Sequence, residues 1–103
     1  MTFPKSIKVG GKTYTIRYPY IFKERTDIGG QACHYTNEIR IADTTSGGEG
    51  IKDINIVASF IHEMLHCVDV VYNAGALDEA TVERLGEGLL QVLADNNLLN
   101  LKQ

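Results

Sequence analysis

The run from Asp53 to Tyr72 constrains this chain most, because it has a helical period and almost no charge. On a helical wheel at about 100° per residue, apolar side chains cover most of the circumference, and polar ones occupy one wedge of roughly 120°. A surface helix carries Lys and Glu along a solvated face, whereas Glu63 is the one such residue here. We therefore expect a buried helix whose polar wedge faces an internal cleft.

Positions 62–66 read His62-Glu63-Met64-Leu65-His66, the pattern H-E-x-x-H, and its two histidines and its glutamate lie in the polar wedge. Two imidazoles four residues apart lie one turn apart on the same helix face, so both can bind one metal ion. Glu63 then lies beside a metal-bound water and can accept its proton. Buried imidazoles and carboxylates cost free energy unless they are paired or metal-bound, so packing alone explains this group poorly. The sequence predicts zinc bound by His62 and His66, with Glu63 as the general base.

A catalytic zinc site has three protein ligands and an open position for water. No histidine follows His66, so the third ligand is expected on the second helix, from Glu79, Glu83 or Glu87. In an antiparallel helix hairpin centred near residues 74–75, positions whose numbers sum to about 149 lie level. Position 83 then faces His66, and Glu83 is the expected ligand. A wide crossing angle would favour Glu79, and a site completed from the strand half would use His34.

The first half of the chain alternates with period two and is rich in β-branched and aromatic residues. This pattern predicts strands at 7–9, 12–21, 31–36 and 38–43, with tight turns at 10–11 and at Asn37. Asp53 and Asp78 are the expected N-caps of two helices, 53–72 and 79–96. The apolar stripe of the second helix comprises Val82, Leu85, Leu89, Val92 and Leu93. Four strands followed by two helices predict an α+β fold with a small antiparallel sheet.

Length and charge restrict the class of protein. A chain of 103 residues has room for one domain, here 1–103. Its net charge of −3 and the lack of a basic cluster argue against nucleic-acid binding. Without a signal-peptide pattern or an apolar run of roughly 18 residues, we expect a cytoplasmic protein without a membrane partner. Cys33 and Cys67 are expected to be buried free thiols.

The motif at 62–66, followed by a helix that carries a glutamate, resembles a minimal zincin metallopeptidase of the gluzincin type. The chain is also similar to short phage and prophage H-E-x-x-H proteins, through the tracts 82–85, 91–93 and 95–96. More loosely, it is similar to the ImmA/IrrE-like and SprT-like groups. The resemblance implies one zinc, a water nucleophile and peptide-bond hydrolysis on a zincin-like core. The chain departs from large gluzincins because it has no second domain to complete a substrate cleft.

The resemblance also implies an edge strand beside the motif helix that pairs with the substrate backbone, for which 38–43 is the candidate. A donor that stabilises the tetrahedral intermediate is expected from His34 or from a tyrosine. The candidate tyrosines are Tyr14, Tyr18, Tyr20, Tyr35 and Tyr72. Asp69 is either a partner of a ligand imidazole or an ordinary polar residue at the helix C-terminus.

These residues lead to two function hypotheses from different classes. The first is a zinc-dependent peptidase that acts on a peptide or protein, with a zinc-activated water and Glu63 as general base. The alternative is a non-enzymatic metal-binding module that acts through a protein partner. Loss of hydrolysis in Glu63→Gln with retention of metal separates the two.

Overall fold

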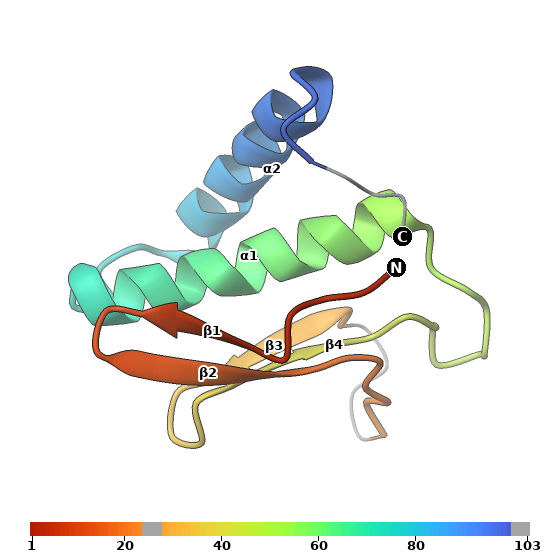
Figure 1. The fold of residues 1–103 in the computed structure, drawn as a ribbon, viewed down its shortest axis with the longest axis horizontal. Coiled ribbons are helices and arrows are strands. Elements are labelled where there is room, and N and C mark those ends of the chain that lie inside the picture. Colours follow the sequence, from red (N-terminus) through yellow and green to blue (C-terminus); the bar gives the residue numbers. More distant parts are fainter. Residues whose placement is uncertain (24–27, 100–103) are drawn as a thin grey trace.

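The computed structural model describes residues 1–23 and 28–99 as a four-stranded sheet followed by two helices (Figure 1). The expected α+β class is confirmed. The strands are β1 (Ser6–Val9), β2 (Lys12–Arg17), β3 (Gly30–Cys33) and β4 (Glu38–Ile41), and the helices are α1 (Asp53–Tyr72) and α2 (Glu79–Asp95).

The sheet has the strand order β1-β2-β4-β3. β1 with β2, and β3 with β4, form antiparallel hairpins, whereas β2 and β4 run parallel. The expectation of a wholly antiparallel sheet is therefore wrong at this central pair. β3 runs opposite to β2 and so carries the chain back along the sheet, and the turn that follows it sends β4 in the same direction as β2. β4 is consequently an inner strand and β3 an edge strand, which corrects the expectation that 38–43 lies at the edge.

The first hairpin turns where the sequence predicted it. Gly10 has a φ of +60°, the left-handed conformation that glycine adopts without a steric penalty. A Cβ atom at this position would also lie 2.7 Å from Cγ1 of Val71, because the turn packs against α1. Both the backbone conformation and the close contact therefore require glycine here. In the second hairpin, Asn37 at the tip has a φ of +53°.

α1 lies across one face of the sheet (Figure 1). Between them is a core built from both halves of the chain, which includes Val9, Tyr14, Ile39, Ile41, Ile56 and Cys67. The expectation that α1 is buried throughout is wrong, because Tyr72 is 71% exposed and Val68 is also exposed. The sheet covers one side of α1, and α2 covers only part of the other.

α1 is long and apolar enough to cross a membrane by length and composition alone, with a mean hydropathy of 1.4. The core helix of a folded domain meets the same criteria, and α1 packs on the sheet in that position.

α2 begins as predicted, because the side chain of Asp78 accepts a hydrogen bond of 2.7 Å from the backbone N–H of Thr81. The predicted cap of α1 is wrong: Lys52 occupies the N-cap position, and Asp53 lies in the first turn. α2 rises obliquely away from α1 instead of running back along it (Figure 1). The predicted apolar stripe is therefore uncovered over much of its length, and Leu85 is 51% exposed.

Candidate metal centre

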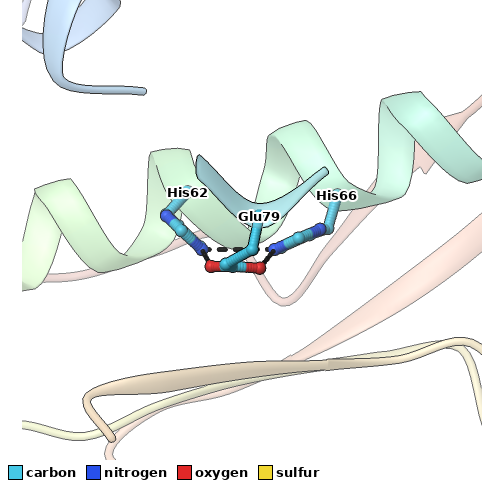
Figure 2. Close-up of side chains that lie close together, drawn as sticks. All are labelled: His62, His66 and Glu79. Carbon is cyan, nitrogen blue, oxygen red and sulfur yellow. Dashed lines mark hydrogen bonds and ion pairs between the residues drawn. The ribbon is translucent and has the colours of Figure 1, made fainter. Parts of the chain in front are cut away.

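The histidines of the H-E-x-x-H motif converge as the helical spacing predicted (Figure 2). His62 and His66 project from the middle of α1, and their Nε2 atoms lie 3.2 Å apart. Each side chain is about a quarter exposed, at 23% and 24%. Two ring nitrogens aimed at one partly open position are the arrangement that a shared metal ion requires.

The carboxylate of Glu79, in the first turn of α2, faces both histidines (Figure 2). Its Oε1 atom lies 2.7 Å from Nε2 of His62, and its Oε2 atom lies 2.9 Å from Nε2 of His66. His62, His66 and Glu79 form a group whose potential ligand atoms all lie within 4.8 Å of one another. The Glu79 side chain is 66% exposed, so the group opens toward solvent.

The structure brings Glu79 to the histidines, whereas the level-matching argument favoured Glu83. That argument assumed that α2 runs back antiparallel along α1. α2 crosses α1 obliquely (Figure 1). Its first turn brings Glu79 to the histidines, its second turn packs Gly86 against His62, and the helix diverges beyond that point. Glu83 and Glu87 line the same cleft without making an ion pair with either histidine among the described residues.

Asp69 holds the linker between α1 and α2 by hydrogen bonds. Its buried carboxylate accepts hydrogen bonds from the backbone N–H of Leu77, at 3.2 Å, and from the side-chain amide of Asn73, at 2.9 Å. The backbone carbonyl of Asp69 also accepts hydrogen bonds from the N–H groups of Asn73 and Gly75. Of the two roles considered for Asp69, its contacts fit that of a helix-terminal residue, which fixes the linker leading to Glu79.

Glu63 lies on the side of α1 that faces the edge strand β3. It is only 9% exposed, yet it lines the same cleft as His62 and Glu79. The backbone N–H of Ala32 donates a hydrogen bond to its carboxylate. Burial raises the pKa of Glu63, whereas the nearby His62 and His66 act to lower it. The raised pKa makes this carboxylate a stronger base than a solvated glutamate.

Two glycines allow the edge strand to approach α1 closely, and the sequence argument did not single them out. A Cβ atom on Gly30 would lie 3.0 Å from Cγ of Glu63, and one on Gly29 would lie 2.9 Å from Oγ of Ser59. The Gly-Gly pair at the start of this strand is the sequence feature that could have indicated such a close approach of the backbone.

The cleft has a volume of about 430 Å³ and is formed by α1, α2 and the start of β3. It is lined by Ile28, Gly29, Gly30, Ala58, Ser59, His62, Glu63, Glu79, Glu83, Gly86 and Glu87. None of the tyrosines considered as donors is among these residues. The buried hydroxyl of Tyr14 instead lies 3.0 Å from Nδ1 of His34, so His34 is engaged outside the metal-binding group.

The donor set fits zinc. Zinc binds imidazole nitrogen at about 2.0–2.1 Å and carboxylate oxygen at about 2.0–2.2 Å, so neighbouring ligand atoms in a tetrahedron lie about 3.3–3.6 Å apart. The two histidine nitrogens, 3.2 Å apart, are already close to this spacing. The Glu79 oxygens, 2.7 Å from His62 and 2.9 Å from His66, would have to move outward by several tenths of an ångström. The described residues supply three such ligands, which leaves one tetrahedral position for a non-protein ligand.

A comparison of the chain with protein-family models, with curated proteins and with solved structures finds no match. The likeness to H-E-x-x-H proteins therefore rests on the spacing of the His62, His66 and Glu79 group.

Proposed function

We propose that this protein is a zinc-dependent peptidase. The observation that carries the proposal is that His62, His66 and Glu79 converge on one position. Two of these residues, His62 and Glu79, line a cleft that is also lined by the buried Glu63. A bound zinc would supply a Lewis acid for a carbonyl oxygen and would lower the pKa of a coordinated water.

Glu63 is the proposed general base. Its carboxylate faces the cleft and is oriented by the N–H of Ala32. A buried carboxylate with a raised pKa can take a proton from water and return it to a leaving amine. The helix places Glu63 next to His62, so the base is held close to the metal ligands without contacting the ion itself.

The number of ligands supports a catalytic site over a structural one. Structural zinc sites are closed by four protein ligands, most often cysteine or histidine. The group at this site has three, and the largest side-chain exposure among them belongs to Glu79. One imidazole pair and one carboxylate also match the His₂Glu donor set of catalytic zinc sites.

The exposed apolar side chains favour a second candidate, a metal-binding module that acts through a protein partner. Leu85, Leu89 and Val92 lie uncovered along one side of α2. Exposed apolar side chains in a row are typical of surfaces that contact another protein. This function does not need Glu63 as a base, and so the two candidates differ in their response to one substitution.

The experiment compares zinc-loaded wild type with Glu63→Gln, using a denatured protein as substrate and mass spectrometry of the products. Glu63→Gln should retain one zinc per chain and lose at least about 100-fold in cleavage rate, because an amide cannot accept the proton. Glu49→Gln, the same change in a loop remote from the cleft, serves as the matched control and should cleave normally. Equal cleavage by Glu63→Gln and wild type would refute the proposed base, and no cleavage by wild type would favour the second candidate.

A further inference from the structure

A second cavity, of about 570 Å³, adjoins the cleft lined by His62 and Glu79 at the edge of the sheet. It is lined by Tyr20, Ile21, Phe22, Lys23, Ile28, Gln31 and Arg40, and we call it the Arg40 pocket. Ile28 lines both cavities, so they meet at the segment that leads into β3. Neither the metal-binding group nor the proposed base uses this pocket.

The two cavities open on opposite faces of the sheet. Gly30 faces Glu63 on the side covered by α1, and side chains alternate along a strand, so Gln31 faces the other side. On β4, Ile39 and Ile41 are buried in the core, whereas Arg40 points to the same open face as Gln31. The Arg40 pocket is therefore on the open face of the sheet, across the edge strand β3 from the cleft lined by His62 and Glu79.

The outer edge of β3 can pair with an extended peptide. The carbonyl of Gly29 accepts a hydrogen bond from the N–H of Ala42, which marks these residues as a hydrogen-bonded pair of the antiparallel ladder. Because such pairs alternate, the backbone groups of Gly30 and Ala32 point away from β4, toward the free edge. The N–H of Ala32 is engaged by Glu63, so the N–H and carbonyl of Gly30 and the carbonyl of Ala32 are the groups that a peptide can meet there. A peptide paired there would run beside the metal-binding group and present alternate side chains to the two faces.

Arg40 retains hydrogen-bonding capacity inside its pocket. Its Nη1 atom donates to Oε1 of Gln31 at 3.0 Å, and its Nε and Nη2 atoms donate to Oε1 of Glu38 at 3.1 and 2.8 Å. A guanidinium group has five N–H donors, so the bonds to the described residues leave two for a ligand. The guanidinium also lies over the ring of Tyr20, 5.2 Å from its centroid, which holds it in place at the pocket wall.

Among the described residues, the charged side chains that line the pocket, Lys23 and Arg40, are both positive. Glu38 is shared between Arg40 and Arg17, whose Nε atom lies 3.0 Å from its Oε2 atom, so one carboxylate serves two guanidinium groups. Lys23 adds a further positive charge to the lining. The rings of Tyr20 and Phe22, 4.9 Å apart, provide an apolar wall beside these cations. A carboxylate carried on a short aliphatic stem is complementary to this combination.

We propose that the Arg40 pocket binds a carboxylate of the peptide that occupies the cleft lined by His62 and Glu79, and so selects which peptides are held at the site. This proposal rests on the proposed function, because it takes a peptide as the ligand. The carboxylate comes from an acidic side chain within the peptide or from its free C-terminus. Both present the same planar oxygen pair to the two remaining N–H donors of Arg40.

The test measures binding to zinc-loaded Glu63→Gln, in which turnover is removed. The first probe series consists of short blocked alanine-serine peptides with one glutamate at successive positions, each compared with the same peptide carrying glutamine. The second series consists of unblocked peptides without glutamate, which end either in a carboxylate or in an amide. One register of the glutamate series, or the free C-terminus, should bind at least about tenfold more tightly than its uncharged counterpart. The series that shows the preference identifies the source of the carboxylate.

Three further substitutions show whether the pocket causes the preference. Gln31→Glu keeps an acceptor for Arg40 but adds a negative charge to the pocket, and it should abolish the preference with the fold intact. Arg40→Gln should abolish it as well. Arg17→Gln is the matched control, because Arg17 shares Glu38 but does not line the pocket, and it should keep the preference.

Failure of this proposal is distinguishable from failure of the proposed function. Equal binding of charged and uncharged peptides, no binding of any peptide, or a preference that survives Gln31→Glu would overturn the pocket proposal, whether or not wild type cleaves. A preference that depends on Gln31 and Arg40 would support it, even if wild type cleaves nothing.

Discussion

At the scale of single residues, the position of the proposed base depends on the small size of Gly30. A Cβ atom there would approach Cγ of Glu63 to 3.0 Å and Cδ1 of Ile41 to 3.2 Å, closer than ordinary van der Waals contact. The edge strand is also the source of the N–H of Ala32 that orients Glu63. Any side chain at position 30 therefore displaces the carboxylate or its donor.

Gly30→Ala is expected to lower the cleavage rate more than the zinc affinity, because it displaces Glu63 and leaves the metal ligands untouched. Overpacking of this kind costs about 1–3 kcal/mol of stability. The measurements are zinc affinity, kcat/KM and the unfolding midpoint. Gly88→Ala is the control: its Cβ meets nothing within 4 Å, and removal of a helical glycine should stabilise α2 by about 0.5–1 kcal/mol. Unchanged kcat/KM in Gly30→Ala would contradict this account of Glu63.

At the scale of elements, the helix boundaries followed from the sequence and the crossing of the helices did not. The 3.6-residue period predicted 53–72, and α1 is observed as Asp53–Tyr72. Periodicity gives the face of a helix but not its direction relative to its neighbour. That direction follows from the contacts of Asp69 with the linker and from the packing of Gly86 on His62 and Leu65. For this reason the convergence of His62 and His66 could be predicted, whereas the choice between Glu79 and Glu83 as their neighbour could not.

Asp69→Ala is expected to weaken zinc binding although Asp69 is not a metal ligand. Loss of its buried hydrogen bonds to Leu77 and Asn73 frees the start of α2, which carries Glu79, and costs about 1–3 kcal/mol of stability. The measurements are the free energy of unfolding and the zinc dissociation constant. Asp95→Ala removes an exposed carboxylate at the end of α2 and should change both by little. Wild-type zinc affinity in Asp69→Ala would show that the linker does not position Glu79.

The open face of the sheet predicts a pH dependence of stability. Hydrogen bonds from Arg40 and Arg17 lower the pKa of Glu38 from its ordinary value of 4.5. A carboxylate whose pKa is lower in the folded state stabilises the protein above the unfolded value, and this contribution is lost as the pH falls through the folded value. The stability difference between wild type and Glu38→Gln, measured by urea unfolding, should therefore be largest above about pH 5 and vanish in acid. A constant difference across this range would contradict the prediction.

At the scale of the whole molecule, the candidate metal-binding group connects the two helices, because His62 and His66 lie on α1 and Glu79 lies on α2. α2 contacts α1 over a limited region around Val82 and Gly86, and much of its apolar stripe is exposed. The sequence predicted which face of α2 is apolar. It could not show whether another element covers that face, because composition carries no information about the neighbouring element. The parallel pairing of β2 and β4 was missed for a similar reason, since alternation defines strands but not their order.

Zinc is expected to raise the thermal unfolding midpoint, because it binds the folded chain and ties α1 to α2. At a free zinc concentration of about 100 times the dissociation constant, the stabilisation is about 2.7 kcal/mol, which corresponds to roughly 10–20 °C for a domain of this size. Calorimetry of the zinc-loaded and chelator-treated protein measures the shift. The double variant His62→Ala with His66→Ala should show no response to zinc, and an equal response would place the ion elsewhere.

The central claim is that His62, His66 and Glu79 bind one metal ion. The most direct measurement is the zinc affinity of Glu79→Gln beside that of Glu83→Gln and Glu87→Gln, three identical changes on one helix in one cleft. Glu79→Gln should lose at least about tenfold in affinity, because it removes a charged ligand, while the other two remain within about threefold of wild type. Wild-type affinity in Glu79→Gln, together with a loss in Glu83→Gln, would contradict the account.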